Sequence, residues 1–107
     1  MRYYFLGIGG IGMSAIARYF KAKGFDVAGY DRTSTVLTRE LEVEGIEVNY
    51  VDEVDEIAEQ YRDVENTLVV YTPAIPADNN QYRYFVDNGF KMMKRAAILG
   101  EITRLER

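Results

Sequence analysis

Apolar residues gather in five short runs that alternate with segments of helical spacing. The runs cover residues 3–6, 27–30, 46–50, 67–71 and 91–93. Apolar runs of this length that are bounded by Gly, Pro or Asp indicate buried strands. We therefore expect five strands, and residues 67–71 carry the strongest signal.

The segments between these runs have apolar residues three or four positions apart. Met13, Ile16 and Phe20 share one face of a helix that begins near residues 10–12 and stops at Gly24. Three further helices are expected. The first has the apolar residues Leu37, Leu41 and Val43 and follows a cap at Thr33, Ser34 or Thr35, and the second has Tyr82, Phe85 and Val86 and follows a cap at Asp78 or Asn79. The third covers residues 96–107, with Ile98, Leu99, Ile102 and Leu105 on its apolar side. The acidic segment 52–65 fits a short surface helix.

A four-residue pattern occurs three times, as GFDV at 24–27, GIEV at 45–48 and GFKM at 89–92. Each copy has a helix-stopping Gly, an apolar residue, a charged residue and a strand residue, as where a helix joins the next strand. Alternating strands and helices imply a parallel sheet with right-handed crossovers. We predict an α/β fold, a Rossmann-like three-layer domain with a five-stranded parallel sheet of order 3-2-1-4-5, which fills residues 1–107 as one domain.

Composition narrows the chemistry open to the chain. Its 107 residues are 48% apolar, which suffices for one core. It has no cysteine and no histidine, so disulfides, thiolate metal sites and the commonest general base are excluded. We expect no catalytic residue and no metal site in it.

Charge and hydropathy exclude two classes of partner. The formal net charge is −4, without the overall basic character of a nucleic-acid-binding domain. No apolar run is long enough to span a bilayer, and the chain enters its first strand without a signal-peptide pattern. We expect no nucleic-acid or membrane partner and a cytoplasmic location.

The loop after the first predicted strand is the most informative motif. Residues 5–17 read FLGIGGIGMSAIA, in which Gly7, Gly9 and Gly12 fit the spacing G-x-G-x-x-G. The first glycine permits a tight turn, the second lets the backbone approach a diphosphate, and the third lets the helix pack closely on the sheet. The helix N-terminus then offers free N–H groups to an anion. The alternative is that the glycines only fit a tight turn.

Asp31 ends the second predicted strand, 19 residues after Gly12. An acid at this place suits ribose hydroxyls, although an acid after a strand can also cap a helix. On these residues alone NAD is the default ligand, as in the NAD-binding Rossmann domain of a dehydrogenase or of a nucleotide-sensing regulator. NADP is disfavoured because Asp31 would repel its 2′-phosphate.

The run GIGGIGMS at residues 7–14 is more specific than the dinucleotide fingerprint and strongly resembles the N-terminal domain of the Mur ligases. Other segments agree along the whole chain: GYD at 29–31 stands for the family's Gly-Ser-Asp, residues 38–45 for its T-x-x-L…G, LVVYTPAI at 68–75 for V-V-x-S-S-A-I, and KRA at 94–96 with Leu99 for R-R-A-E-M-L. Within the family the loop is most similar to the members that attach L-alanine, which begins the peptide stem of bacterial cell-wall precursors.

This resemblance implies an ATP-dependent amide-bond ligase of peptidoglycan biosynthesis with three domains. The first would hold the UDP moiety of UDP-N-acetylmuramate, the central one would bind ATP and Mg²⁺, and the last would help to bind the amino acid. The chain contains no G-x-x-x-x-G-K-[ST] P-loop. We therefore expect the first domain only, without a cofactor of its own and inactive as a ligase, with UDP-N-acetylmuramate and the missing central and C-terminal domains as partners.

The resemblance also implies substrate-binding residues. Backbone amides from Gly9 to Ser14 would receive the diphosphate, Asp31 would meet the uridine ribose, and residues after the fourth strand would line the nucleotide pocket. Arg95 would add positive charge, since guanidinium suits phosphate oxygens, or would be an ordinary exposed arginine, the description that fits Arg32 better. The expected substrate-binding set is Gly7, Gly9, Gly10, Ile11, Gly12, Met13, Ser14, Asp31, Thr72, Ala74, Ile75 and Arg95.

Two positions depart from the family pattern. The family often has Gly-His after the third strand, with the His facing the nucleotide, where this chain has Val51-Asp52. Its Ser-Ser pair is Thr72-Pro73 here, which keeps a hydroxyl and loses a backbone donor. These changes affect the expected uracil and ribose contacts more than the diphosphate site.

Other functions stay open beside this one. One is the NAD-binding domain described above. Another is a family relative that attaches a preformed peptide to the same nucleotide sugar, whose loop is less regular in glycine. A third is a protein-interaction module with a vestigial loop, which would bind neither nucleotide.

Overall fold

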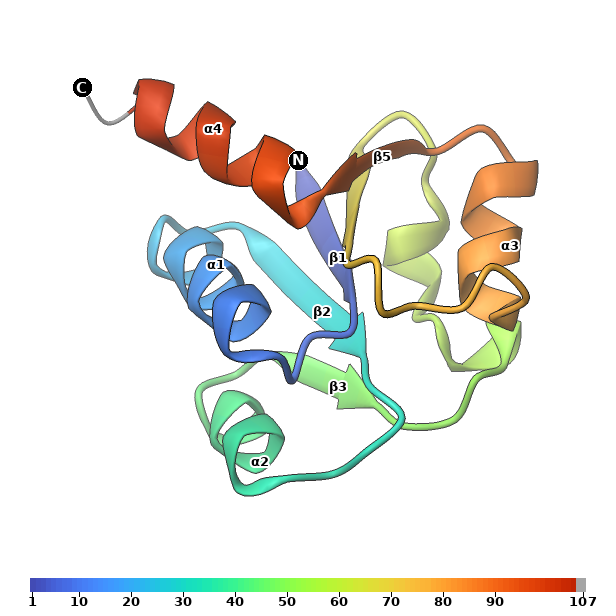
Figure 1. The fold of residues 1–107 in the computed structure, drawn as a ribbon, viewed down its shortest axis with the longest axis horizontal. Helices are drawn as coiled ribbons and strands as arrows, with labels where there is room; N and C mark the ends of the chain where they lie inside the picture. The colour runs from blue at the N-terminus through green and yellow to red at the C-terminus, as the bar shows by residue number, and fades with distance from the viewer. Residues whose placement is uncertain (106–107) are drawn as a thin grey trace.

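The computed structural model of the chain describes residues 1–105, apart from the side chain of Leu105. Five parallel strands form one sheet: β1 (Arg2–Leu6), β2 (Asp26–Tyr30), β3 (Glu47–Asn49), β4 (Thr67–Tyr71) and β5 (Lys91–Lys94). Their order is β3-β2-β1-β4-β5 (Figure 1), so the predicted fold class and strand order are confirmed.

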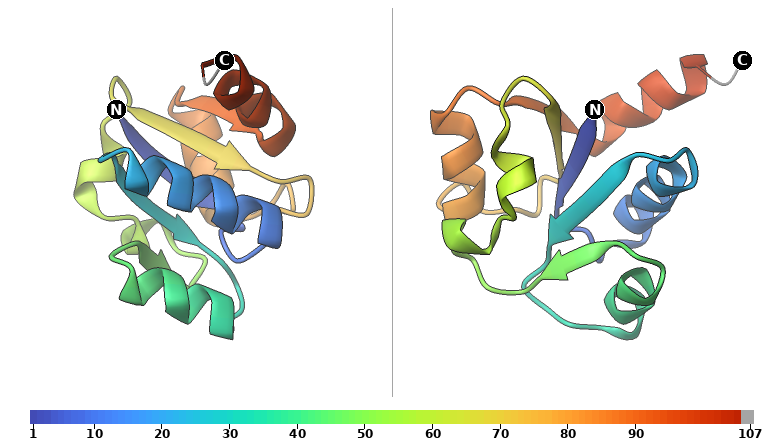
Figure 2. Two further views of the ribbon diagram at one scale, coloured as in Figure 1. Left: turned by 90° about the vertical axis from the view of Figure 1, so that its left-hand side faces the viewer. Right: turned by 180° about the vertical axis from the view of Figure 1, so that it is seen from behind.

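Helices cover both faces of this sheet and make three layers. One face carries α1 (Ile11–Ala22), α2 (Val36–Val43) and α4 (Arg95–Leu105). The other face carries α3 (Asn80–Asp87) and two short 3-10 helices, η1 (Val54–Glu56) and η2 (Glu59–Arg62) (Figure 2). Residues 106–107 of the last predicted helix, and the side chain of Leu105, lie outside the described part of the chain.

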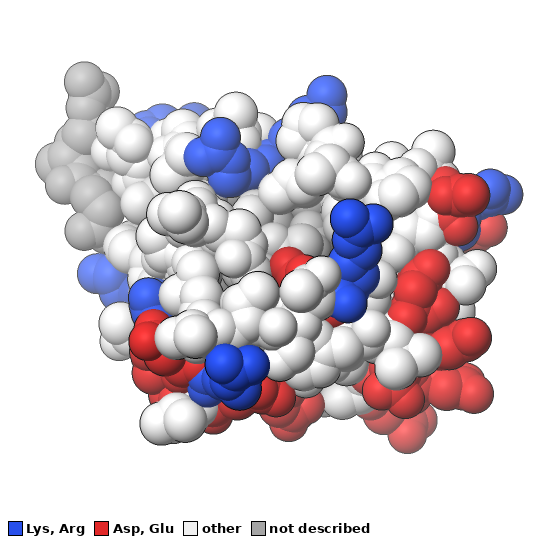
Figure 3. Space-filling model, turned by 60° about the horizontal axis from the view of Figure 1, so that its bottom comes forward, with Lys and Arg blue, Asp and Glu red and all other residues white. Residues whose placement is uncertain are grey.

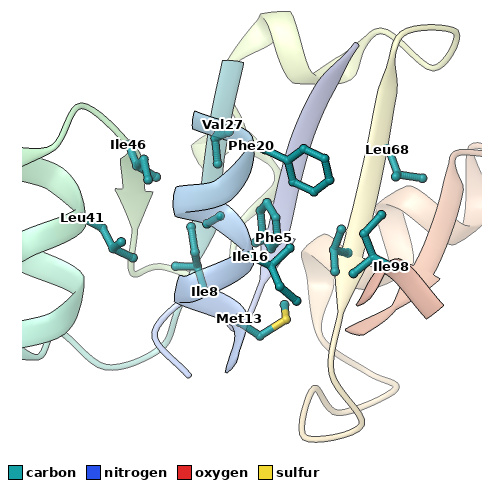
Figure 4. Close-up of a cluster of buried hydrophobic side chains, with 12 residues drawn as sticks. Phe5, Ile8, Met13, Ile16, Phe20, Val27, Leu41, Ile46, Leu68 and Ile98 are labelled. Atoms are coloured by element: carbon teal, nitrogen blue, oxygen red, sulfur yellow. The ribbon is translucent and has the colours of Figure 1, made fainter. Parts of the chain in front are cut away.

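Each face of the sheet has its own apolar core. On the α1 side, Phe5 packs with Met13, Ile16 and Phe20, so the predicted helical face is confirmed (Figure 4). On the other side, Tyr4 is buried in a second cluster. Neighbouring residues of β1 thus enter opposite clusters, as the two-residue period of a strand requires. Burial on both faces explains why the strands appear as continuous apolar runs.

The repeated pattern GFDV, GIEV and GFKM forms the same helix end three times. Its glycines have φ of +93° at Gly24, +91° at Gly45 and +73° at Gly89. The residue after each glycine donates its N–H to the carbonyl five residues earlier, for example Phe25 to Phe20 at 3.1 Å. This is the Schellman arrangement, in which the left-handed residue is usually glycine. The predicted junctions between helices and strands are confirmed.

Some details of the secondary structure differ from the expectation. The acidic segment 52–65 forms η1 and η2 rather than one helix. The side chains of Val43 and Val86 are 88% and 47% exposed, so they lie outside the apolar faces of α2 and α3. Leu99 is 40% exposed, whereas Ile98 is buried. In the described residues no helix has the length and apolar character needed to cross a membrane.

Candidate functional site

A cavity of about 650 Å³ opens at the edge of the sheet where β1, β2 and β4 end. In a doubly wound fold this edge is where ligands bind, beside the point at which the strand order reverses. Figure 3 brings this edge forward: its central region is mostly uncharged, and acidic groups gather along the lower and right-hand margins. The lining residues are Gly7, Gly10, Tyr30, Asp31, Arg32, Asp52, Thr72, Ala74, Ile75, Pro76, Asp78 and Asn79.

The glycine loop turns tightly against the end of β2. Gly7 has φ of +90°, a conformation that favours glycine. The N–H groups of Gly7 and Ile8 both donate to the carbonyl of Tyr30, at 2.8 and 3.0 Å. Gly10 then donates to the carbonyl of Gly7 at 3.2 Å and becomes the N-cap of α1. The loop is therefore fixed before any ligand arrives.

Asp31 is bonded to this loop. Its carboxylate accepts the N–H of Gly9 at 2.8 Å and the N–H of Thr33 at 3.1 Å. A Cβ on Gly9 would lie 2.7 Å from Asp31 Oδ2 and 2.8 Å from Thr38 Cγ2, which explains why a glycine is needed there. The cap of α2 is Thr35, so the helix-cap interpretation of Asp31 is wrong.

The first turn of α1 is open to a ligand. The N–H groups of Ile11, Gly12 and Met13 precede the first intrahelical donors. The N-cap Gly10 has no side chain to accept from them, and the turn contains no acid. An uncapped helix N-terminus offers both hydrogen-bond donors and partial positive charge to an anion.

Two of the other helices that start at this edge, α2 and α3, are closed by side chains. Thr35 accepts the N–H of Thr38 in a capping box at α2. At α3, Asn79 accepts the N–H of Tyr82, and Asp52 accepts the N–H groups of Asn80 at 2.8 Å and Gln81 at 3.0 Å. Of α1, α2 and α3, the helix with an open start is therefore α1, which follows the glycine loop.

Three of the expected amide donors are already used within the protein: the N–H of Gly9 donates to Asp31, that of Gly10 to the carbonyl of Gly7, and that of Ser14 to the carbonyl of Gly10. Ser14 is buried, its N–H donates to the carbonyl of Gly10, and its hydroxyl donates to the carbonyl of Ile11. Ser14 therefore has no free donor for a diphosphate. The side chain of Met13 is in the apolar core, so only its backbone N–H faces the loop.

Arg95 lies against the first turn of α1. A Cβ on Gly12 would be 2.7 Å from Arg95 Nη1 and 3.2 Å from its Cδ. The expectation that Gly12 lets the helix approach the sheet is wrong, because the close neighbour of Gly12 is this side chain. Arg95 is exposed, and its guanidinium lies against the first turn of α1, where its positive charge would suit an anion.

The loop after β4 forms the opposite wall of the cavity. The hydroxyl of Thr72 accepts the N–H of Ala74 at 3.2 Å, and the carbonyl of Thr72 accepts the N–H of Ile75 at 3.1 Å. All three residues line the cavity, as expected. Pro73 is exposed and does not line it.

Sequence reasoning missed half of the lining. Tyr30, Asp52, Pro76, Asp78 and Asn79 were not expected in the site, and Arg32 was expected to be solvated. The available signal was position, because residues that follow β2, β3 and β4 meet at one edge of a parallel sheet.

Tyr30, the last residue of β2, forms a buried part of the cavity wall. It is 6% exposed, and burial raises the pKa of its hydroxyl. The negative charges of Asp52 and Asp31 raise this pKa further, while the charge of Arg32 and a hydrogen bond with Asn79 lower it. Its hydroxyl therefore stays protonated at neutral pH. It can donate or accept a hydrogen bond, but it carries no charge.

The described residues contain no group of three or more acids that could hold a metal ion. The donor set at the open turn, backbone N–H groups and a guanidinium, instead suits an anion such as a phosphate.

The sheet, the glycine loop and the open helix start define a Rossmann-like domain whose switch point presents free backbone N–H groups. The profile described as "Mur ligase family, catalytic domain" matches residues 2–107. The chain belongs to the Mur ligase family.

Similar proteins agree with this assignment. A UDP-N-acetylmuramate–L-alanine ligase of Porphyromonas gingivalis is 55% identical over 106 residues, which are 99% of this chain and 23% of that protein. One of Christiangramia forsetii is 59% identical over 102 residues, 94% of this chain and 23% of its own length. The solved UDP-N-acetylmuramate-alanine ligase of Thermotoga maritima has a TM-score of 0.88 at 29% identity, covering 100% of this chain and 24% of that one. The chain thus spans about a quarter of the length of these relatives.

Proposed function

We propose that the chain is the N-terminal, UDP-binding domain of an ATP-dependent UDP-N-acetylmuramate–L-alanine ligase of bacterial peptidoglycan biosynthesis. The observation that carries this proposal is the open first turn of α1 beside a 650 Å³ cavity, in a chain 55% identical to ligases of that name. ATP and Mg²⁺ would bind in a central domain outside this chain. A cytoplasmic location remains a prediction.

In this proposal the diphosphate lies on the N–H groups of Ile11, Gly12 and Met13, with Arg95 against its oxygens. The nucleoside enters the cavity, where Asp31 is close enough to the loop to accept from a ribose hydroxyl with its remaining lone pairs. Residues 72–75 form the far wall.

The role of the domain is then to bind and orient. The resemblance implies that ATP converts the substrate carboxylate to an acyl phosphate, which the amine of L-alanine attacks. None of these groups is bound by this chain. Holding the nucleotide end fixes where the carboxylate lies relative to the other domains, and such positioning lowers the entropic part of the barrier.

A second candidate is the NAD-binding domain, which the glycine loop and Asp31 would also suit. The sequence relatives favour the ligase domain instead. A solved UDP-N-acetylmuramate:L-alanyl-γ-D-glutamyl-meso-diaminopimelate ligase from Neisseria meningitides and a murein peptide ligase from Psychrobacter arcticus have the same fold at 22% and 24% identity, which is evidence of fold alone.

The test is a titration of the chain with UDP-N-acetylmuramate and, separately, with NAD, followed by backbone amide chemical shifts. We expect the nucleotide sugar to shift the amides of residues 9–13 and 72–75, and NAD to shift neither. The Arg95→Ala variant should bind about tenfold more weakly, the loss expected for one charge-assisted hydrogen bond, while Arg83→Ala, an exposed arginine outside the cavity, should bind normally.

Three other outcomes are informative. Shifts with NAD alone would contradict the ligase-domain proposal. Shifts with neither ligand would reject UDP binding by this chain. Ligase activity of the chain with ATP, Mg²⁺ and L-alanine would contradict the assignment of ATP binding to another domain.

A further inference from the structure

Thr38 has no part in the proposed binding of the nucleotide, although it opens the segment 38–45 that resembles the family pattern T-x-x-L…G. It lies in the first turn of α2, is fully buried, and does not line the cavity. The two branches of its side chain, the hydroxyl and the methyl group, contact different parts of the molecule.

The hydroxyl of Thr38 closes the start of α2. It accepts the N–H of Thr35 at 2.8 Å and donates to the carbonyl of Thr35 at 3.1 Å. The N–H of Thr38 in turn donates to the hydroxyl of Thr35 at 3.1 Å. A threonine side chain has few allowed χ1 rotamers, so a buried side chain with these bonds holds its methyl group in one place.

The methyl group of Thr38 packs against the glycine loop. Its Cγ2 lies 2.8 Å from the position that a Cβ on Gly9 would take, and Asp31 Oδ2 lies 2.7 Å from the same position. Two side chains therefore contact Gly9. Asp31 accepts its N–H at 2.8 Å, and Thr38 packs on it through a carbon atom.

The glycine loop depends on such neighbours to keep one conformation. Of residues 7–10, only Ile8 has a side chain, which is buried in the apolar core. Glycine loses more conformational freedom on folding than any other residue, so the loop is costly to order. The same loop leads into the open first turn of α1, whose N–H groups bind most tightly when they are already aimed at the ligand.

We propose that Thr38 is a positioning residue for the diphosphate: its methyl group holds the glycine loop where the first turn of α1 receives the anion. This inference rests on the proposed function. Thr38 touches no ligand and acts through Gly9, so the start of α2 supports the start of α1.

The experiment removes the two branches of Thr38 one at a time. Thr38→Ser keeps the hydroxyl and removes the methyl group, whereas Thr38→Val keeps the shape of the side chain and removes the hydroxyl. The matched control is Thr67→Ser, because Thr67 is also buried but begins β4, at the opposite end of that strand from the cavity. Titration calorimetry gives the affinity of each variant for UDP and for inorganic pyrophosphate, and unfolding in urea gives its stability.

We expect Thr38→Ser to weaken the binding of UDP and of pyrophosphate about fourfold, the factor that corresponds to one buried methyl group. Thr67→Ser loses the same group and should bind both ligands as the native chain does. Thr38→Val should bind both within about twofold of the native chain, although the loss of its capping box makes it less stable than Thr38→Ser. Affinity and stability thus fall in different orders.

Three results would overturn the proposal. One is an unchanged affinity in Thr38→Ser. Another is an equal loss of affinity in Thr67→Ser, because affinity would then follow stability and not the contact with Gly9. The third is weaker binding by Thr38→Val than by Thr38→Ser, because the hydroxyl would then matter more than the methyl group.

Amide hydrogen exchange of the chain without ligand tests the contact itself. Thr38→Ser should speed the exchange of the Gly9 N–H, because its bond to Asp31 opens more often, and Thr67→Ser should not. Equal exchange of Gly9 in both variants would overturn the proposal. A native chain that binds both ligands, with an equally tight Thr38→Ser variant, refutes only the role of Thr38, whereas a native chain that binds neither ligand refutes the proposed function as well.

Discussion

At the scale of the residue, several glycines are needed because another atom occupies the position that a Cβ would take. Gly9 leaves room for the carboxylate of Asp31, and Gly12 leaves room for Arg95. Gly29, inside β2, faces the carbonyl of Phe5 on the neighbouring strand. The spacing of the glycines predicted a phosphate loop, but the identity of each neighbour depends on segments far away in the sequence.

Gly29→Ala is expected to destabilise the fold. Its Cβ would lie 2.5 Å from the carbonyl oxygen of Phe5 and 2.8 Å from Ile8 Cδ1. Overpacking against backbone costs about 1–3 kcal/mol or more, measured as the free energy of unfolding in urea. Gly100→Ala, whose Cβ enters open space on α4, is the control and should be neutral or stabilising by up to about 1 kcal/mol. Equal stability of the two variants would contradict the close approach at Gly29.

Gly12→Ala should separate stability from binding. The new Cβ meets the end of the flexible Arg95 side chain, and alanine favours the helix, so the free energy of unfolding should change by less than about 1 kcal/mol. The guanidinium must leave its place, so the affinity for UDP should fall about tenfold in calorimetry.

The control for this prediction is the double variant with Arg95→Ala. If Gly12→Ala acts by displacing Arg95, the two losses of affinity will not add. Fully additive losses would show that the Cβ blocks the ligand directly.

At the scale of the element, helices that start at one edge of the sheet differ in what closes their N-termini. α2 and α3 are capped by side chains, and α3 receives Asp52 from the loop after β3. α1 has no such cap. The site is therefore set as much by the capping of its neighbours as by the glycine loop itself.

Asp52→Ala should weaken the start of α3. Two N–H groups, of Asn80 and Gln81, lose their acceptor. Loss of a cap costs about 0.5–2 kcal/mol, to be measured as the free energy of unfolding in urea. Asp55→Ala, an exposed acid on η1, is the matched control and should stay within about 0.5 kcal/mol of the native chain. A loss of the same size in both variants would show that charge, not capping, is responsible.

At the scale of the whole molecule, buried polar groups join its layers. Gln81 of α3 is fully buried, accepts the hydroxyl of Tyr4 at 2.7 Å and donates to Asn49 at 2.9 Å. Asn49 in turn donates to the Tyr4 hydroxyl at 2.8 Å. Such a network is stable only when every member is satisfied, so it fixes how α3, β1 and β3 lie together.

Stability should fall in alkali because of buried tyrosines. Burial, helped by the charges of Asp26 and Glu47, raises the pKa of Tyr61 to about 12, whereas the unfolded value is near 10. A raised pKa contributes stability that is complete below pH 10 and is lost as the pH rises towards 12. Tyr61→Phe should reduce the slope of unfolding free energy against pH by roughly 1.4 kcal/mol per unit in this range.

The control for this prediction is Tyr50→Phe, since the Tyr50 hydroxyl bonds to Glu42 at the surface. This variant removes a surface hydroxyl and serves as the reference against which the alkaline slope of Tyr61→Phe is compared. An unchanged slope in Tyr61→Phe would show that Tyr61 ionises as readily in the folded state as in the unfolded state.

The fold was largely predictable because its signals are local. The sequence contains five apolar runs, helical spacing between them, and three copies of a glycine junction. Together with right-handed connections, these features indicate the strand order and the crossovers of the sheet. The caps at Thr35 and Asn79 were among the candidates for the same reason. The two 3-10 helices were missed, because a short acidic segment has little periodicity to distinguish them from an α-helix.

The sequence by itself determined the architecture, the glycine loop and the family resemblance, because each depends on residues close together in the chain. Only the tertiary structure decided that Arg95 covers Gly12, that Asp31 is bonded to Gly9, that Asp52 caps α3, and that Arg32 enters the cavity. These pairs are separated by 22 or more residues or depend on a wall built from several strands. Local spacing sets which way a chain turns, whereas packing of the whole sheet sets which side chains meet at its edge.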